Sequence, residues 1–172
     1  MKIFLIGFMG CGKTTLGKRF ASKMDYAFID LDHQLEVEAG MSVGEFFAEY
    51  GEAGFRAFES KVLKNLSYPE NCVVATGGGA PCYFDNMDFM NNTGITVYIE
   101  MPPLALAKRL ENGKHKRPLI MNMNEEELIG FITAKLDERN PFYTRATISV
   151  GGIDINPEQL KLQLVNSGLL DI

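Results

Sequence analysis

The chain of 172 residues has no excess of positive charge, with 17 Lys and Arg against 22 Asp and Glu and a net charge of −5. Proteins that bind nucleic acid or a membrane surface use a basic face to offset phosphate charge, so the composition argues against both classes of partner. A small anionic substrate remains compatible with this charge, provided that arginines converge locally.

Cysteines and long apolar runs are also scarce. Cys11, Cys72 and Cys82 are odd in number and have no C-x-x-C spacing, which argues against a disulfide framework and indicates reduced thiols. The apolar run after Met1 and Lys2 imitates the start of a signal peptide, but it ends within a few residues, and no segment approaches the ~20 apolar residues of a membrane span. We therefore expect a cytoplasmic protein.

The sequence contains no internal repeat, linker or low-complexity segment. Its length and its 46% hydrophobic residues suffice for one well-buried core but not for two typical domains. We expect a single domain over residues 1–172, and a monomer because no oligomerisation signal is visible.

The most informative segment present is Gly7–Thr14, which matches G-x-x-x-x-G-K-[ST] and follows the apolar run Ile3–Ile6. Its backbone N–H groups can surround phosphate oxygens, Lys13 can reach the β- and γ-phosphates, and the Thr14 hydroxyl can ligate Mg²⁺. The alternative is a glycine-rich turn with a chance lysine, but the preceding strand and the helical pattern that follows favour a nucleotide site. The predicted nucleotide-binding residues are Gly10, Cys11, Gly12, Lys13, Thr14 and Thr15.

Short apolar runs alternate with helical patterns along the chain. This alternation predicts an α/β fold of three layers, a five-stranded parallel sheet with helices on both faces. The predicted strands are Ile3–Ile6, Tyr26–Ile29, Cys72–Ala75, Thr96–Ile99 and Thr147–Val150. The predicted helix starts are Ser42 with Glu45, Asn124 with Glu127, and Asn156 with Gln159. Ligands of such sheets bind beyond the carboxyl ends of the strands.

Two aspartates, Asp30 and Asp32, follow the second predicted strand. A carboxylate there can hold Mg²⁺ or one of its waters, or can deprotonate a hydroxyl that attacks a γ-phosphate. The alternative is an N-cap, because Leu31–Ala39 has a helical pattern. The phosphate loop one strand away favours the functional interpretation.

The third predicted strand ends in Gly77, Gly78 and Gly79. Three residues without side chains let the backbone approach a ligand closely and leave its amides free to donate to substrate oxygens. A flexible turn is the alternative. The position at the carboxyl end of a strand favours a binding role.

Two arginines lie on otherwise apolar helical stripes. Arg56 is spaced to pair with Glu59, and Arg139 ends the stripe of residues 128–136. Each could be structural, Arg56 as part of a surface ion pair. Because a guanidinium suits bidentate recognition of a carboxylate, the two together indicate a carboxylated substrate.

The segment Gly113–Pro118 is basic and begins with glycine. Most such runs are solvated surface, and Lys114, His115 and Lys116 fit that description. In a nucleotide enzyme, a basic loop can instead close over the phosphates. We expect a mobile lid around residues 112–124, with Arg117 as its functional cation.

Taken in order, these motifs resemble the shikimate kinase family of P-loop kinases over about residues 1–150. The motifs that carry the resemblance are Gly7–Thr14, Asp30-x-Asp32, Phe55-Arg56-x-x-Glu59, Gly77–Gly79, Arg117-Pro118-Leu119 and Arg139-x-Pro141-x-Tyr143. The resemblance implies ATP-dependent phosphorylation of the 3-hydroxyl of shikimate, on the route to aromatic amino acids, with ATP and Mg²⁺.

The resemblance also implies roles for individual residues. Asp32 would contact the substrate hydroxyls and act as the base, while Lys13 and Arg117 would neutralise charge on the transferring group. Thr14 would ligate Mg²⁺, with Asp30 acting through water. Arg109, with the segment Gly151–Pro157, would lie on the adenine side. The implied shikimate-binding residues are Asp32, Arg56, Gly77, Gly78, Gly79 and Arg139.

The chain departs from the family pattern at two places. Cys11 stands where another small residue is usual, which the loop should tolerate because it binds phosphate through its backbone. Thr144 and Arg145 stand where acidic residues often follow the tyrosine, which bears on local pairing near Arg139 and not on the activity.

Three other classes of protein share the phosphate loop. A related kinase acting on gluconate is the nearest, but the paired aspartates, Arg56 and the glycine triplet favour shikimate. A GTP-binding switch would need N-K-x-D, which is absent. A motor or transporter ATPase would need an apolar strand ending in Asp, and the nearest candidate, Thr96–Glu100, runs into Met101 and two prolines.

Overall fold

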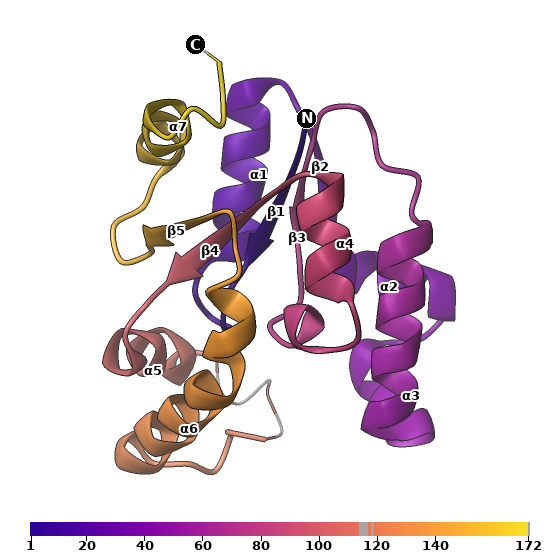
Figure 1. Cartoon of the computed structure of the whole chain (residues 1–172). Coiled ribbons are helices and arrows are strands. Elements are labelled where there is room, and N and C mark those ends of the chain that lie inside the picture. Colours follow the sequence, from indigo (N-terminus) through magenta and orange to yellow (C-terminus); the bar gives the residue numbers. More distant parts are fainter. Residues whose placement is uncertain (114–116, 118, 172) are drawn as a thin grey trace.

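The computed structural model describes residues 1–113, 117 and 119–171. These residues form a five-stranded sheet in the order β2-β3-β1-β4-β5, with all four neighbouring pairs parallel (Figure 1). The strands are β1 (Lys2–Ile6), β2 (Ala27–Asp30), β3 (Cys72–Ala75), β4 (Ile95–Glu100) and β5 (Ile148–Gly151). The predicted parallel α/β fold is confirmed, although β2 and β5 each begin and end one residue later than predicted.

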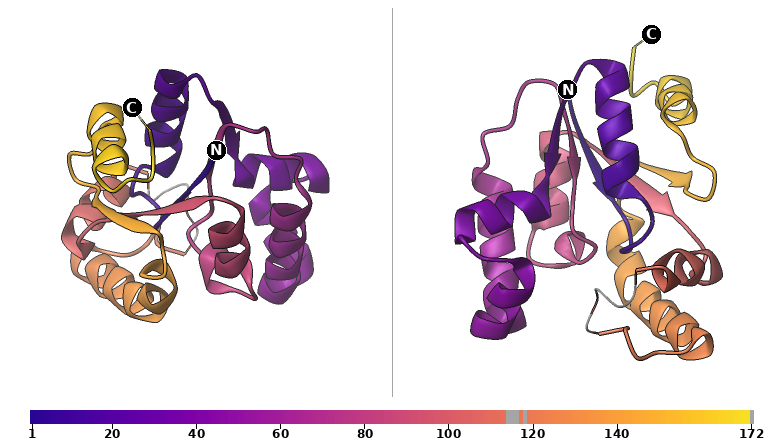
Figure 2. Two further views of the ribbon diagram at one scale, coloured as in Figure 1. Left: turned by 45° about the horizontal axis from the view of Figure 1, so that its top comes forward. Right: turned by 180° about the vertical axis from the view of Figure 1, so that it is seen from behind.

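Helices cover both faces of the sheet and give the three layers that the alternating pattern predicts (Figure 2). Helices α1 and α7 pack against each other on one face, whereas α4 contacts β4 and α3 on the opposite side. Helix α5 packs against α6, and α2 against α3. The helices are α1 (Lys13–Met24), α2 (Leu31–Ala39), α3 (Val43–Asn65), the 3₁₀ helix η1 (Ala80–Cys82), α4 (Asn86–Thr93), α5 (Pro103–Glu111), α6 (Glu125–Tyr143) and α7 (Pro157–Asn166).

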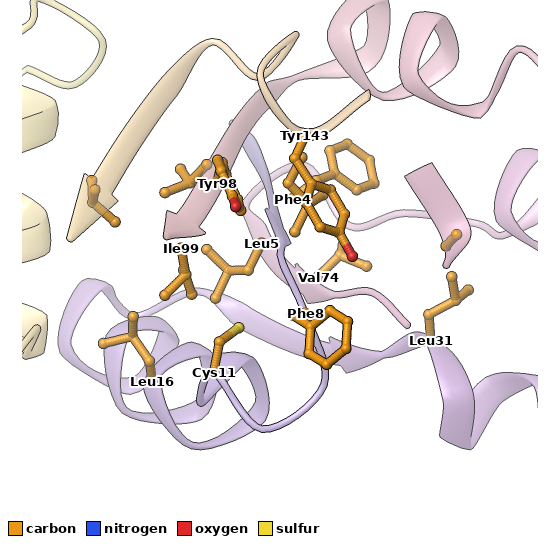
Figure 3. Packing of buried hydrophobic residues seen from close by; sticks show 14 of the residues in the cluster. Phe4, Leu5, Phe8, Cys11, Leu16, Leu31, Val74, Tyr98, Ile99 and Tyr143 are labelled. Carbon is orange, nitrogen blue, oxygen red and sulfur yellow. The ribbon is translucent and has the colours of Figure 1, made fainter. Parts of the chain in front are cut away.

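The central strands are buried on both sides, as expected for a parallel sheet between two helical layers. Residues 3–6 of β1 have no exposed surface, and β3 is an apolar, fully buried run. Figure 3 shows Phe4 and Leu5 of β1 packed among Val74, Tyr98 and the loop residues that follow β1. The loops that follow these strands are therefore anchored on a tightly packed core.

The predicted helix starts are confirmed by their hydrogen bonds. Asn124 and Asn156 each form a reciprocal capping box with the residue three positions later, and the Ser42 hydroxyl accepts from the Glu45 N–H. Helix α3 is kinked at Gly51, whose φ of 73° lies in the left-handed region. None of the described helices has the length and apolar character to cross a membrane.

The strand order brings three predicted motifs to one edge of the sheet. Strand β3 lies between β2 and β1, and Ala75 is in register with both Asp30 and Leu5. The phosphate loop, the two aspartates and the glycine triplet leave these neighbouring strands at their carboxyl ends. Segments up to about 70 residues apart in the chain therefore meet in one place.

Candidate functional site

The phosphate loop leaves β1 and leads into α1 through two glycines in left-handed conformations, Gly10 with φ 82° and Gly12 with φ 95°. Gly12 is the N-cap residue of α1. The first N–H groups of a helix have no partner within it, and the helix dipole makes this end positive. The loop therefore presents donors and positive potential to an anion.

Lys13 is buried, and its ammonium group lies against the loop itself. Nζ donates to the carbonyl oxygens of Gly7 at 2.6 Å and Phe8 at 3.1 Å. These two bonds hold the cation next to the predicted phosphate position. The third N–H of the ammonium group lies on the weak acceptor Cys11 Sγ at 3.7 Å, so it is the donor most easily turned to a phosphate oxygen.

Cys11 contributes its backbone to the site and a thiol that accepts from Lys13 Nζ at 3.7 Å. Its side chain is 2% exposed and lies in the apolar core near Leu16 and Ile99 (Figure 3). Its carbonyl oxygen accepts from Nη1 of Arg109 at 3.2 Å. The inward position fits the expectation that the loop tolerates a cysteine here.

Asp30 fits both interpretations of its sequence position, because its two carboxylate oxygens have different partners. Oδ1 caps α2 by accepting from the N–H groups of Asp32 at 3.1 Å and His33 at 3.5 Å. Oδ2 accepts from the hydroxyl of Thr14 at 3.4 Å. Adjacent ligands on an octahedral Mg²⁺ are about 3.0 Å apart, so Thr14 and Asp30 fit a magnesium site with a small adjustment or a bridging water.

Asp32 lies at the start of α2, beside the glycine triplet. A Cβ atom on Gly77 would lie 3.0 Å from Oδ1 of Asp32, so the carboxylate closely approaches this backbone. Solvent reaches the side chain through the cavity mouth, but the surrounding protein displaces much of the nearby water. This burial, together with the charge of Asp30, raises the pKa of Asp32 above its usual value.

The three carbonyl groups of the glycine triplet are all hydrogen-bonded. Gly77 O accepts from Ala80 N at 3.1 Å, and Gly79 O accepts from Cys82 N at 3.0 Å. Gly78 O accepts from the hydroxyl of Tyr143. The N–H groups of the triplet donate to no other described residue. They are therefore available to a ligand.

The pair of Arg56 with Glu59 is buried and is not a surface ion pair, although Nε of Arg56 also lies 3.8 Å from Oε1 of the exposed Glu52. Nη1 donates to Oε1 of Glu59 at 3.0 Å. The guanidinium Cζ lies 4.5 Å from the ring centre of Tyr83 and 5.3 Å from that of Phe55. These aromatic faces and Glu59 hold the cation against Gly79, where a Cβ atom would lie 2.6 Å from Cζ.

Glu59 is 1% exposed, and only one of its two carboxylate oxygens has a hydrogen-bond partner among the described residues. Its Oε1 binds Arg56, but Oε2 has no hydrogen-bond partner among the described residues. Burial raises the pKa of Glu59 to about 7, although Arg56 opposes the shift. The free oxygen lies on the Gly77 side, 3.4 Å from where a Cβ of Gly77 would be.

Arg139 approaches the triplet from α6. Its guanidinium lies over the ring of Phe8, 5.4 Å from the ring centre, and Nη1 would lie 3.3 Å from a Cβ atom on Gly78. Arg56 and Arg139 thus reach neighbouring glycines from different helices. Two guanidinium groups beside free N–H donors make a site suited to a carboxylate.

A cavity of about 410 Å³ joins most of these groups. It is lined by Met9, Gly10, Gly12, Lys13, Thr14, Thr15, Asp30, Asp32, Thr76, Gly77, Gly78, Arg109 and Arg117. The predicted residues outside this lining are Cys11, Arg56, Gly79 and Arg139. A larger cavity of about 740 Å³ between α6, β4 and β5 contains no part of the phosphate loop, the aspartates or the triplet, so size does not identify the site here.

Two further arginines adjoin the phosphate loop. Arg109 donates to Cys11 O and also to Ile153 O at 3.3 Å, which links the loop to the predicted adenine-side segment. Nη1 of Arg117 lies 3.6 Å from the sulfur of Met9, at the cavity lining. The predicted lid residues Lys114, His115, Lys116 and Pro118 lie outside the described residues.

Some residues of the site had no role assigned from sequence. Met9 and Thr76 line the cavity, Tyr83 covers Arg56, and the Tyr143 hydroxyl holds Gly78. Met9 has a local signal, because it lies within the phosphate loop. Tyr143 belongs to the motif Arg139-x-Pro141-x-Tyr143, although its bond to Gly78 joins distant segments. Tyr83 has no signal, because its contact with Arg56 joins distant segments.

Comparison with known proteins agrees with this geometry. A family model described as shikimate kinase matches residues 9–167. The chain is 50% identical over 146 residues to a shikimate kinase of Bacteroides thetaiotaomicron, covering 85% of this chain and 83% of the relative. It is 48% identical over 148 residues to a shikimate kinase of Parabacteroides distasonis, covering 86% of each.

Two crystal structures are similar over nearly the whole chain. One is a shikimate kinase from Bacteroides thetaiotaomicron, with a TM-score of 0.90 and 44% identity, covering 97% of this chain and 98% of that one. The other is a shikimate kinase from Acinetobacter baumannii in complex with shikimate, with a TM-score of 0.85 and 33% identity, covering 99% of this chain and 95% of that one.

Proposed function

The chain belongs to the shikimate kinase family, and we propose that it transfers the γ-phosphoryl group of ATP to the 3-hydroxyl of shikimate. The products are shikimate 3-phosphate and ADP, on the route to aromatic amino acids. One observation carries the assignment. The glycine triplet lies between the phosphate loop and two arginines, so an acceptor held by its carboxylate can place a hydroxyl beside Asp32.

The nucleotide phosphates bind at the loop and the positive end of α1. Donors from residues 12–15 contact the phosphate oxygens, and Lys13 moves from the loop carbonyls to the transferring group. Arg117, which lines the same cavity beside Met9, adds a second cation. Thr14 and Asp30 are the residues that would hold a magnesium ion, which would supply positive charge to offset that of the phosphates.

Asp32 receives the proton of the attacking hydroxyl. It lies beside Gly77 of the triplet and lines the same cavity as Lys13. Its raised pKa makes it a stronger base than an ordinary aspartate, while Lys13 and Arg56 favour its ionised form. Most of the catalysis then comes from positioning and charge stabilisation, as in other phosphoryl transfers.

Arg56, Arg139 and the N–H groups of the triplet hold the acceptor carboxylate. The two guanidinium groups are constrained by Glu59 and by aromatic rings, so little side-chain entropy is lost on binding. We extend the proposal to a single cytoplasmic domain that acts as a monomer and whose segment 112–124 closes over ATP. The position of Arg117 beside Met9 supports the last point.

The deciding experiment is a coupled assay of ADP release with Mg-ATP and three conditions: shikimate, gluconate or no acceptor. We expect rapid release with shikimate only, and loss of release when EDTA removes Mg²⁺. The sugar acid gluconate tests the nearest alternative kinase. Release with gluconate, or equal release without an acceptor, would reject the substrate assignment while leaving the nucleotide site intact.

A further inference from the structure

The last two turns of α6 present two side chains to the glycine triplet. Arg139 and Tyr143 are four residues apart and therefore lie on the same helix face. Arg139 has a role in the proposed function, but Tyr143 has none. Tyr143 has no exposed surface, and its hydroxyl donates to the carbonyl oxygen of Gly78 at 2.5 Å.

The ring of Tyr143 is fixed by packing. It lies against the ring of Tyr98, with 5.0 Å between the ring centres, and both tyrosines belong to the buried core (Figure 3). Burial raises the pKa of Tyr143, although Arg139, which also contacts the hydroxyl, opposes the shift, so the hydroxyl stays protonated and remains a donor at physiological pH. Gly78 O therefore has a permanent, well-placed partner.

This partner matters because of where Gly78 lies in the triplet. The carbonyl groups of Gly77 and Gly79 are held by main-chain N–H groups of the 3₁₀ turn that follows. The Gly78 carbonyl is held by a side chain instead. A peptide group between two glycines meets little steric resistance to rotation, so the Tyr143 hydroxyl is the restraint that selects its orientation.

Peptide geometry carries this restraint to the other side of the backbone. Gly78 C=O and Gly79 N–H belong to one planar trans peptide and point in opposite directions. When the Gly78 carbonyl points toward α6, the Gly79 N–H points away from α6. Gly79 itself lies against the guanidinium of Arg56. The Gly79 N–H donates to no other described residue.

We propose that Tyr143 is a positioning residue for the acceptor: by holding Gly78 O, it directs the Gly79 N–H, beside Arg56, toward the acceptor carboxylate. The inference rests on the proposed function, since it assumes an acceptor that binds through a carboxylate at Arg56. Tyr143 would then affect the affinity for the acceptor without touching it.

The chain supplies a matched control. Tyr98 packs against Tyr143 with its ring tilted by 31° and is also largely buried, and its hydroxyl donates to Oδ1 of Asn140 at 3.1 Å instead of to the triplet. Tyr143→Phe and Tyr98→Phe each remove one hydroxyl from one aromatic pair. A general loss of packing affects both variants. Tyr143→Phe also removes the contact between its hydroxyl and Arg139, so its KM is read together with hydrogen exchange at the Gly79 N–H with shikimate bound, which the proposed role makes faster in this variant than in the wild type.

The first test measures KM for shikimate, KM for ATP, kcat and the melting temperature of both variants. For Tyr143→Phe we expect a shikimate KM raised about 5- to 20-fold, the effect of losing one well-placed hydrogen bond to a charged group. We expect kcat within about 3-fold and an ATP KM within about 2-fold of the wild type. For Tyr98→Phe we expect all three parameters within about 2-fold.

An unchanged shikimate KM in Tyr143→Phe, or an equal rise in both variants, would overturn the inference. A second measurement uses the wild type and does not depend on the folding of a variant. Saturating shikimate should slow hydrogen exchange at the Gly79 N–H, and absence of this protection would also reject the proposal. If wild-type protein fails to phosphorylate shikimate, the proposed function fails instead, so the two failures are distinguishable.

Discussion

Gly79 lies so close to Arg56 that a single methyl group at residue 79 would overlap the guanidinium, with Cβ 2.6 Å from Cζ. Glu59 and the ring of Tyr83 hold Arg56 in this position. A side chain at residue 79 would therefore require the guanidinium to leave these partners.

Gly79→Ala should displace Arg56 and weaken acceptor binding. We expect a shikimate KM raised about 10- to 100-fold, because a carboxylate contact is lost, with a nearly unchanged ATP KM. Gly130→Ala, in α6, is the control, since a Cβ atom there meets nothing within 4 Å. Steady-state kinetics of both variants give the comparison, and a normal shikimate KM in Gly79→Ala would contradict the close approach.

Asp32→Asn should remove the base and leave nucleotide binding intact. The expected fall in kcat is about 10²- to 10⁴-fold, the usual effect of losing a general base. Isothermal titration calorimetry with ADP should give a dissociation constant within about 3-fold of the wild type. Normal turnover in this variant would exclude Asp32 from proton transfer.

Asp30 allows its capping and magnesium roles to be separated. Asp30→Asn keeps an oxygen that can cap α2, so stability should stay within about 0.5 kcal/mol, while the Mg²⁺ concentration for half-maximal rate should rise. Asp30→Ala should show the same Mg²⁺ effect and lose about 1 kcal/mol more. Urea unfolding and Mg²⁺ titrations measure the two effects. An unchanged Mg²⁺ requirement in both variants would reject the magnesium role of Asp30 and leave it only the role of capping α2.

Glu59 should make stability depend on pH. Its pKa in the folded protein is about 7 against 4.5 for a free side chain, so folding favours the protonated form. The stability from this proton is fully present below about pH 4.5 and is lost as the pH rises through 7. The side chain of Glu59→Gln is uncharged at every pH. The wild type should therefore lose stability relative to this variant as the pH rises from about 4.5 to 7.

Melting temperatures of the wild type and Glu59→Gln at pH 5, 6, 7 and 8 provide this measurement. The variant also changes the partner of Arg56, but that offset does not vary with pH. A difference in melting temperature that stays constant from pH 5 to 8 would show that Glu59 is ionised throughout.

Local patterns in the sequence predicted the parts of the site that follow directly from a strand. The phosphate loop, the two aspartates and the glycine triplet each begin where an apolar run ends, and parallel pairing brings such ends together. Patterns could not decide between cap and metal ligand for Asp30, because that depends on which oxygen faces Thr14. Here the two oxygens have different partners.

The parts that escaped prediction depend on contacts between distant segments. The Tyr143 hydroxyl reaches Gly78 across 65 positions of the chain, and Tyr83 reaches Arg56 from another element. Lys13 was predicted to bind phosphate, but its bonds to the loop carbonyls follow from the conformation of the loop and not from its residue types. Neither kind of contact leaves a periodic signal.

The two bonds from Lys13 to its own loop make nucleotide binding a competition. The carbonyl groups of Gly7 and Phe8 act as an internal substitute for phosphate and keep the ammonium group in place between turnovers. Both carbonyl groups are neutral, so a negatively charged phosphate oxygen is a stronger acceptor for the same ammonium group. The loop therefore favours an anion before the base of the nucleotide makes any contact.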